Sequence, residues 1–226
     1  MKSQATVRIA ILLLAASALP LKFALAEGTK AGCAPPPGFV DLPQPPIDRS
    51  DRMVSRTETI VIDRPLVTVL SVVNRPLKDV LRPTGSLPGV IGTYPLTQGD
   101  FGKPGSRRLV CLSDGSLTEE QVLTRDRGGN SYRFRYQVWN YTSRAAGSIR
   151  YAIGEFVYTA PTAGRTRILW TYSFALRRDR FPGYLGRPGD FLFRVGFLDR
   201  DWAQVMRNVL NGYRMAAENE TVSTAN

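Results

Sequence analysis

The sequence predicts an α+β fold in which a curved antiparallel sheet is covered by one long C-terminal helix. Several short runs of alternating or β-branched residues are separated by turn residues, which is typical of an antiparallel meander. One long amphipathic stripe lies near the C-terminus. The dry face of such a sheet has to be covered, and this stripe is the only long apolar stripe available for it.

Residues 1–26 have the layout of a secretory signal peptide. Two cations precede an apolar run from Ile9 to Leu19, and Ala24-Leu25-Ala26 offers a cleavage site of small residues. The run is about half of the ~20 residues that span a bilayer, so an uncleaved membrane anchor is the less favoured alternative. We expect an exported protein, periplasmic or secreted, whose mature chain begins at Glu27.

Residues 27–56 are rich in proline, in the stretches APPPGF and DLPQPP. Proline removes backbone donors and favours extended, polyproline-like structure. The segment is therefore predicted to be either a linker or a strap that lies on the following domain.

Cys33 and Cys111 are the two cysteines of the chain. In an oxidising compartment they favour a disulfide, which would pin the proline-rich segment to a strand. Equally, both could remain free thiols, with Cys111 acting as a small buried apolar group. Lipid attachment at Cys33 is the third and least favoured alternative, because Lys30 stands where such a site needs an apolar residue.

Composition excludes several classes of chemistry. The 226 residues carry a net charge of +11 and include no histidine. A Ser-His-Asp or Cys-His triad is therefore impossible, and two cysteines cannot complete a thiolate zinc site, so we expect no metal and no cofactor. The arginines are scattered, which suits weak contact with an anionic membrane surface but not nucleic-acid binding.

The domain itself is predicted over residues 57–218. Residues 75–81 resemble a short helix with proline in its first turn. Strands are predicted for runs rich in β-branched or alternating residues, namely TETIVI, LVTVLSVVN, RRLVCLS, EEQVLT, SYRFRYQVWNY, SIRYAIGEFVYT and TRILWTYSFAL.

Alternation predicts which face of the sheet is dry, because successive side chains in a strand point to opposite faces. Tyr132, Phe134 and Tyr136 share one face, opposite the arginines between them. In a later strand, the residues that share the dry face are Ile168, Trp170, Tyr172 and Phe174. Each ring alone is ordinary core packing, but together these rings with polar tips also suit a binding cavity.

A long helix is predicted after Asp199 or Asp201, either of which could cap it. Its apolar stripe recurs at steps of three and four residues and consists of Trp202, Val205, Met206, Val209, Leu210 and Tyr213. Beyond this helix the chain becomes polar, so residues 219–226 are expected to fray.

The glycine-rich stretch of residues 87–117 is not a phosphate-binding loop. Gly102-Lys103 is followed by Pro104, which has no N–H to offer a phosphate, and the next segment is predicted as a strand rather than a helix. No Gly-x-Gly-x-x-Gly leads into a helix either. The glycines are expected to serve turns and close approaches of the backbone.

The same stretch, followed by Tyr132-x-Phe134-x-Tyr136, GEFVYTAP, GRTRILWTYSF and the closing helix, resembles the START-like (helix-grip) superfamily. Within it, the chain is most similar to the polyketide cyclase/dehydrase and lipid-transport (SRPBCC) family. The resemblance covers residues 57–218 and implies a seven-stranded antiparallel sheet wrapped around the C-terminal helix. It also implies a cavity for a lipid, polyketide or aromatic molecule between sheet and helix.

We therefore expect a binding or carrier protein for a hydrophobic small molecule. The predicted ligand contacts are Tyr132, Phe134, Tyr136, Trp170, Tyr172, Phe174, Trp202, Met206 and Leu210. One alternative is a cyclase or dehydratase that uses Tyr, Asp or Glu in the same cavity, and another is an accessory structural protein with a filled core. No catalytic residue is assigned, because Glu155, the most tempting carboxylate, alternates with Phe156 and so is placed on the outer face. The sequence leaves the oligomeric state open.

Overall fold

The computed structural model describes residues 32–73, 75–99 and 101–220. The predicted signal peptide (1–26), the first part of the proline-rich segment and residues 221–226 of the predicted tail lie outside the described residues. Among the described residues, no helix is long and apolar enough to cross a membrane.

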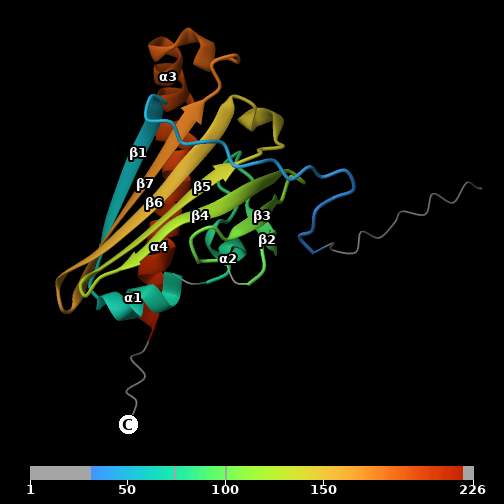
Figure 1. The fold of residues 1–226 in the computed structure, drawn as a ribbon. Helices are drawn as coiled ribbons and strands as arrows, with labels where there is room; N and C mark the ends of the chain where they lie inside the picture. Colours follow the sequence, from blue (N-terminus) through green and yellow to red (C-terminus); the bar gives the residue numbers. More distant parts are fainter. Residues whose placement is uncertain (1–31, 74, 100, 221–226) are drawn as a thin grey trace, which may run out of the picture. The chain divides into compact units, whose positions relative to one another are not determined.

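The described chain forms one seven-stranded antiparallel sheet and one long C-terminal helix, so the predicted fold class is confirmed (Figure 1). The sheet order is β1-β7-β6-β5-β4-β3-β2. The strands are β1 (Met53–Ile62), β2 (Val90–Pro95), β3 (Arg107–Leu112), β4 (Leu117–Arg127), β5 (Ser131–Trp139), β6 (Ile149–Thr162) and β7 (Arg165–Leu176). The helices are α1 (Leu66–Val73), α2 (Leu77–Val80), α3 (Arg187–Phe193), a π-helical segment (Arg194–Trp202) and α4 (Ala203–Asn219), with short 3-10 turns at Arg144–Ala146 and Gly183–Leu185.

Strands β2 to β7 follow one another across the sheet as hairpins, while β1 pairs with β7 at the far edge. The chain must therefore cross from one edge to the other between β1 and β2, and α1 and α2 make this crossing. Turn chemistry fixes the hairpins locally. Between β3 and β4, Gly115 has a φ of 81°, which favours glycine, and the Asp114 side chain accepts the Ser116 N–H at 3.0 Å.

The predicted strand LVTVLSVVN is wrong, because this segment forms α1. Its β-branched residues indicated a strand, but Pro65 precedes the helix, and the Pro65 carbonyl accepts the Val69 N–H at 3.1 Å. Val69 and Val72 are fully buried one turn apart, a helical spacing. Packing of this face against the core outweighs the weak β propensity of the residues. The strand that sequence reasoning missed is β2, a short edge strand containing Gly92.

The C-terminal helix starts earlier than predicted. Helical backbone continues without a break from Arg187 through the π-helical segment to Asn219, a length of roughly 50 Å. The capping prediction for Asp199 and Asp201 is therefore wrong. Gly186, with a φ of 68°, and proline in the first turn begin the helix instead, and Asp199 lies within it and pairs with Arg56 at 2.7 Å.

The core lies between the concave face of the sheet and α4. Burial of the predicted stripe is confirmed for Val205, Met206, Val209, Leu210 and Tyr213. On the sheet side, Trp170 stacks on Phe156 with ring centroids 4.7 Å apart, and Tyr172 contacts Trp202 at 4.6 Å. Large apolar side chains each contribute about 2 kcal/mol when fully buried, so this aromatic layer is a main source of stability.

The proline-rich segment is a strap: residues 32–52 lie on the convex face of the sheet. The Leu42 carbonyl accepts the Trp139 indole N–H at 3.1 Å, and the Gln44 amide donates to Gln137 at 2.7 Å. Beneath it, Trp139 and Tyr151 form a second apolar cluster with exposed fractions of 1% and 0%. The strap therefore covers part of the convex face, and β1 begins at Met53 rather than at Thr57.

Of the three alternatives for the cysteines, the structure has the disulfide between Cys33 and Cys111. It joins the strap to β3 across 78 residues of sequence. Gly92 on the neighbouring strand makes room for it, since a Cβ there would lie 2.8 Å from the Cys33 Cβ.

Replacing both cysteines (Cys33→Ser with Cys111→Ser) should lower the free energy of unfolding by about 3–4 kcal/mol, because the bridge restricts a long loop of the unfolded chain. Urea unfolding with and without reductant measures this. Reductant should destabilise the wild type by a similar amount and leave the double variant unchanged. Two free thiols counted in the unfolded wild type without reductant would contradict the bridge.

Candidate functional site

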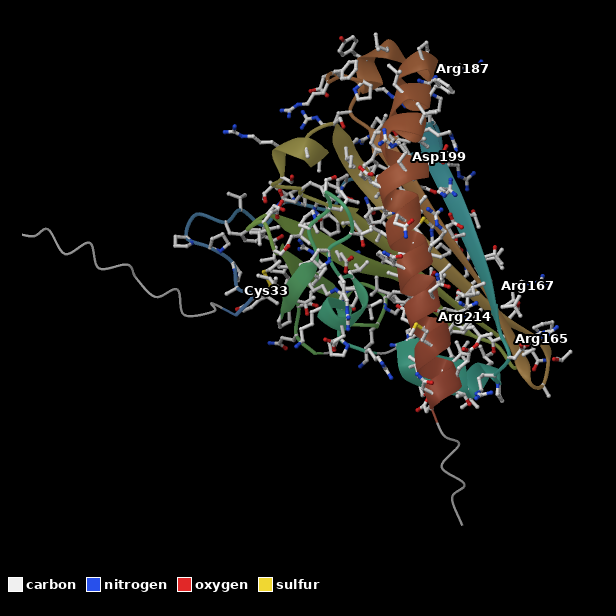
Figure 2. The ribbon with its side chains drawn as sticks, turned by 180° about the vertical axis from the view of Figure 1, so that it is seen from behind. Cys33, Arg165, Arg167, Arg187, Asp199 and Arg214 are labelled. Carbon is white, nitrogen blue, oxygen red and sulfur yellow. A yellow bond between two sulfur atoms is a disulfide. The ribbon has the colours of Figure 1, made fainter. Side chains whose placement is uncertain are left out.

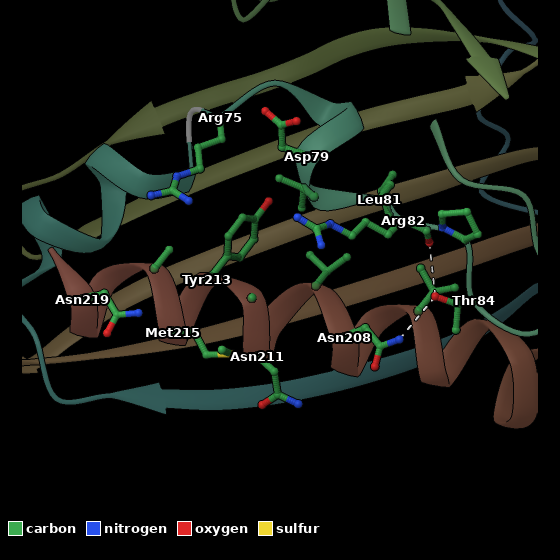
Figure 3. A pocket seen from close by; sticks show the side chains of 16 residues that line it. Arg75, Asp79, Leu81, Arg82, Thr84, Asn208, Asn211, Tyr213, Met215 and Asn219 are labelled. Atoms are coloured by element: carbon green, nitrogen blue, oxygen red, sulfur yellow. Dashed lines mark hydrogen bonds between the residues drawn. The ribbon is translucent and has the colours of Figure 1, made fainter. Parts of the chain in front are cut away.

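Two adjoining hollows lie between the concave face of the sheet, α2 and α4. The first, which we call the inner chamber, has a volume of 190 Å³ and is lined by side chains of β3 to β6, α2 and Tyr213. The second, the outer groove, has a volume of 590 Å³ and lies between residues 75–84 and α4 (Figure 3). The hollows share Arg75, Val80, Leu81 and Tyr213, so the groove adjoins the chamber through these side chains.

Aromatic rings form the sheet wall of the inner chamber. Tyr132, Phe134 and Tyr136 come from β5. They face inward because the alternation predicted from the sequence holds along this strand. On β6, Phe156 and Tyr158 continue the wall, with the rings of Tyr132 and Tyr158 centred 5.5 Å apart. The wall is thus apolar over the ring faces and polar at the phenol oxygens.

Gly154 allows the Tyr136 ring to lie across β6. The two residues face each other in the β5–β6 register. A Cβ at position 154 would stand 2.2 Å from the Tyr136 Cζ, so any other residue would displace the ring. The glycine of the GEFVYT stretch therefore positions a chamber residue.

An ion pair closes one side of the chamber. Arg108 on β3 and Glu120 on β4 face each other in register and are 2.6 Å apart. Glu120 has an exposed fraction of 6%, and the Arg108 guanidinium lies 3.9 Å from the centre of the Phe101 ring. The Phe101 ring thus packs on Arg108, and the ion pair places a buried carboxylate at the chamber wall.

A second arginine reaches the chamber because β4 is irregular. The register between β4 and β5 shifts between Val122 and Thr124, so Arg125 faces inward where regular alternation would place Thr124. Arg125 donates to the Gly102 carbonyl at 3.3 Å and lies 5.8 Å from the centre of the Tyr132 ring. The chamber wall thus combines three arginines, Arg75, Arg108 and Arg125, with one carboxylate.

The phenols of the chamber are hydrogen-bond donors at physiological pH. Burial raises the pKa of Tyr136 and Tyr158 well above the ordinary tyrosine value, and the nearby negative charge of Glu120 raises the pKa of Tyr136 further. Burial also raises the pKa of Tyr213, against the opposing effect of Arg108. A ligand in the chamber therefore meets neutral hydroxyl groups.

The nine predicted ligand contacts separate into two groups. Tyr132, Phe134 and Tyr136 line the chamber. The others do not line it and pack in the aromatic core between sheet and helix, namely Trp170, Tyr172, Phe174, Trp202, Met206 and Leu210. As contacts of a ligand, all nine stay predictions. Glu155 faces outward, as expected, and pairs with Arg133.

Sequence reasoning missed Phe101, Arg108, Glu120, Arg125, Tyr158 and Tyr213 as chamber residues. Tyr213 belongs to the apolar stripe predicted for the C-terminal helix, and a signal also existed for Arg108 and Glu120. Alternation places Arg108 with Val110, and Glu120 with Val122, and paired strands then bring the two charges together. No comparable signal existed for Arg125, whose orientation depends on the irregularity in β4.

The fold and the chamber define a helix-grip protein with a hollow between sheet and helix. No protein-family model and no curated protein matches the chain. Among solved structures, it is similar to the Zhui aromatase/cyclase from Streptomyces sp. R1128, with 15% identity and a TM-score of 0.53 over 77% of this chain and 100% of that chain.

Two larger proteins show a similar match. The di-domain ARO/CYC StfQ from the steffimycin biosynthetic pathway is 15% identical, with a TM-score of 0.52 over 75% of this chain and 52% of that chain. The di-domain ARO/CYC BexL from the BE-7585A biosynthetic pathway is 20% identical, with a TM-score of 0.50 over 76% and 52%. This chain thus spans about half of each di-domain protein, and at these identities the similarity shows the fold alone.

The raised pKa values of the buried tyrosines predict alkaline destabilisation. Above pH ~10 the unfolded chain loses phenolic protons that the folded chain retains, so stability should fall by about 1.4 kcal/mol per pH unit for each such tyrosine; below pH ~10 both states keep the proton and the effect vanishes. Urea unfolding at several pH values from 9 to 11 measures the slope. Tyr158→Phe should make this slope shallower by about 1.4 kcal/mol per pH unit, the contribution of one tyrosine.

Phe156→Leu is the matched control, because it changes a neighbouring ring without removing an ionisable group. It should lower stability equally at every pH. If the slope of Tyr158→Phe is as steep as that of the wild type, the raised pKa of Tyr158 is contradicted.

Proposed function

We propose that the protein binds a hydrophobic small molecule with an aromatic or polyketide-like body and polar substituents in the inner chamber. The observation that carries this proposal is the lining, in which rings surround one buried ion pair and several neutral phenols. Mostly apolar walls with a few fixed polar groups are typical of ligand sites. The presence of aromatase/cyclases among the similar structures agrees with this class of ligand.

The size of the hollows supports the same proposal. Ligand pockets usually enclose about 300–1,000 Å³. The chamber alone, at 190 Å³, suits a small ring system, and the adjoining groove of 590 Å³ offers room for a longer molecule. We infer that the ligand enters between residues 75–84 and α4, where Asn208 and Thr84 join the two walls by a 3.3 Å hydrogen bond (Figure 3).

A cyclase or dehydratase is the second candidate function, and one observation favours it. Glu120 is a buried carboxylate at the chamber, and its charge acts on the neutral phenol of Tyr136. A carboxylate and a phenol at one site can serve as proton acceptor and donor. The third candidate, a structural protein with a filled core, is less favoured because the two hollows leave the space beside α2 and α4 open.

Ligand binding is tested by native mass spectrometry of the purified protein and by melting with a panel of aromatic and polyketide-like molecules. A ligand at about 100 times its Kd should raise the melting temperature by about 5–11 °C. Glu120→Gln should reduce this rise. Glu119→Gln is the matched control, because Glu119 is also paired with an arginine but lies beneath the strap.

The outcomes separate the candidates. If Glu120→Gln loses the ligand-induced rise in melting temperature while Glu119→Gln keeps it, the result supports binding in the chamber. If the wild type converts a bound molecule, and Glu120→Gln still binds that molecule but no longer converts it, the result supports an enzyme. No co-purified molecule and no melting response to the panel would reject both and leave the filled-core protein.

We also propose that the chain is exported and begins at Glu27 after cleavage. The order of charges, apolar run and small residues motivates this proposal, and a disulfide agrees with an oxidising compartment. Intact-mass measurement of the protein recovered from outside the cytoplasm should give the mass of residues 27–226. A mature species that retains residues 1–26 would contradict it.

A further inference from the structure

A group of large apolar side chains is exposed at the end of the molecule where the C-terminal helix begins. We call it the tip patch, and it consists of Phe181, Tyr184, Leu185, Phe191, Leu192 and Val195. Phe181, Tyr184 and Phe191 have exposed fractions of 62%, 60% and 62%, and the rings of Phe181 and Tyr184 are centred 6.1 Å apart. Isolated exposed apolar residues are common, but six large ones gathered within residues 181–195 indicate an interaction surface.

The tip patch is not needed to hold the helix on the domain. The opposite side of the helix anchors it, because Phe193 and Leu198 are buried and the Phe193 ring lies 5.3 Å from Phe174. Phe191, Leu192 and Val195 are spaced at helical intervals on the outer side. This part of the helix therefore has an apolar face toward the core and a second one toward solvent.

Positive charge surrounds the patch. Residues 177–200 contain six arginines and three aspartates, a net charge of +3. Each aspartate is already paired with an arginine: Asp179 with Arg177, Asp190 with Arg178, and Asp199 with Arg56. Arg180, Arg187 and Arg200 are exposed, and Figure 2 shows Arg187 at this end of the helix. A partner of this surface must combine an apolar layer with negative charge.

We propose that the tip patch docks on the surface of a bilayer rich in anionic lipids. Phenylalanine, tyrosine and leucine side chains would enter the boundary between headgroups and acyl chains, while the arginines contact lipid phosphates. A second copy of this chain fits less well, since it would bring the same positive charge to the interface. The proposal concerns a surface remote from the outer groove and does not depend on the proposed ligand.

The test uses two single-tryptophan additions in the full chain. Phe191→Trp places an indole in the tip patch, and Val67→Trp on α1, exposed to 66%, is the matched control. With vesicles of equal parts phosphatidylglycerol and phosphatidylcholine, emission of Phe191→Trp should shift to the blue and be quenched by brominated lipid. The control should show neither change beyond that of the wild type, and pure phosphatidylcholine should bind much more weakly.

The charge requirement is tested by reversal at two positions. Arg180→Glu with Arg187→Glu should weaken binding to the anionic vesicles by roughly tenfold or more. Arg167→Glu with Arg214→Glu changes the net charge equally at sites away from the tip (Figure 2) and should have a much smaller effect. Both pairs are on the surface, and unchanged melting verifies that the variants fold.

Three results would overturn the proposal. One is the same response to anionic vesicles from both added tryptophans, which would indicate no preferred docking surface. Another is an equal effect of the two charge reversals, which would indicate attraction by net charge only. The third is no response of Phe191→Trp to either vesicle, which would leave the tip patch to a protein partner.

Discussion

The concave face of the sheet is mostly apolar, and α4 together with α1 and α2 has to keep water from it. Helix α4 packs along β1 at one edge of the sheet, whereas α2 packs on β2 at the other edge. Where α4 lies close to the sheet, Met206 and Leu210 meet the rings of β6 and β7 and fill the space. Farther across the sheet, residues 73–81 around α2, the loop at Phe101 and Tyr213 of α4 face β3 to β5 and leave a hollow there. The chamber follows from this difference in coverage.

An arginine–glutamate pair joins β3 and β4 on each face of the sheet, and the two pairs have different surroundings. On the convex face, Arg107 pairs with Glu119, whose other oxygen accepts the Asn140 amide at 2.6 Å and the Leu42 N–H at 3.2 Å. That carboxylate is fully occupied by the strap and its neighbours. On the concave face, Arg108 pairs with Glu120 beside a hollow. Adjacent residues in the sequence thus form an ion pair enclosed by the strap on one face and an ion pair beside a hollow on the other.

Much of this arrangement follows from residue periodicity, because a strand has a period of two and a buried face must be apolar. The alternation in β5 and β7 therefore placed Tyr136 and Trp170 on the concave face. It could not tell that Trp170 packs in a solid layer while Tyr136 lines a hollow, since that depends on the distance to α4. Alternation could not predict the inward orientation of Arg125 or the helix α1, for two other reasons. A one-residue irregularity reverses the face of Arg125, and packing makes a helix of a β-branched segment.

The strap has a consequence for the order of assembly. It precedes the sheet in the sequence, yet its contacts are with Trp139 on β5 and the Tyr151 hydroxyl on β6, about a hundred residues later. During vectorial synthesis or translocation this segment emerges first, but its binding surface exists only once β6 has paired. Contacts of such long sequence separation form late, after more local hairpins. The earliest part of the domain to leave the ribosome thus waits for strands made about a hundred residues later before it can dock, and the covalent link to β3 then holds it on the sheet.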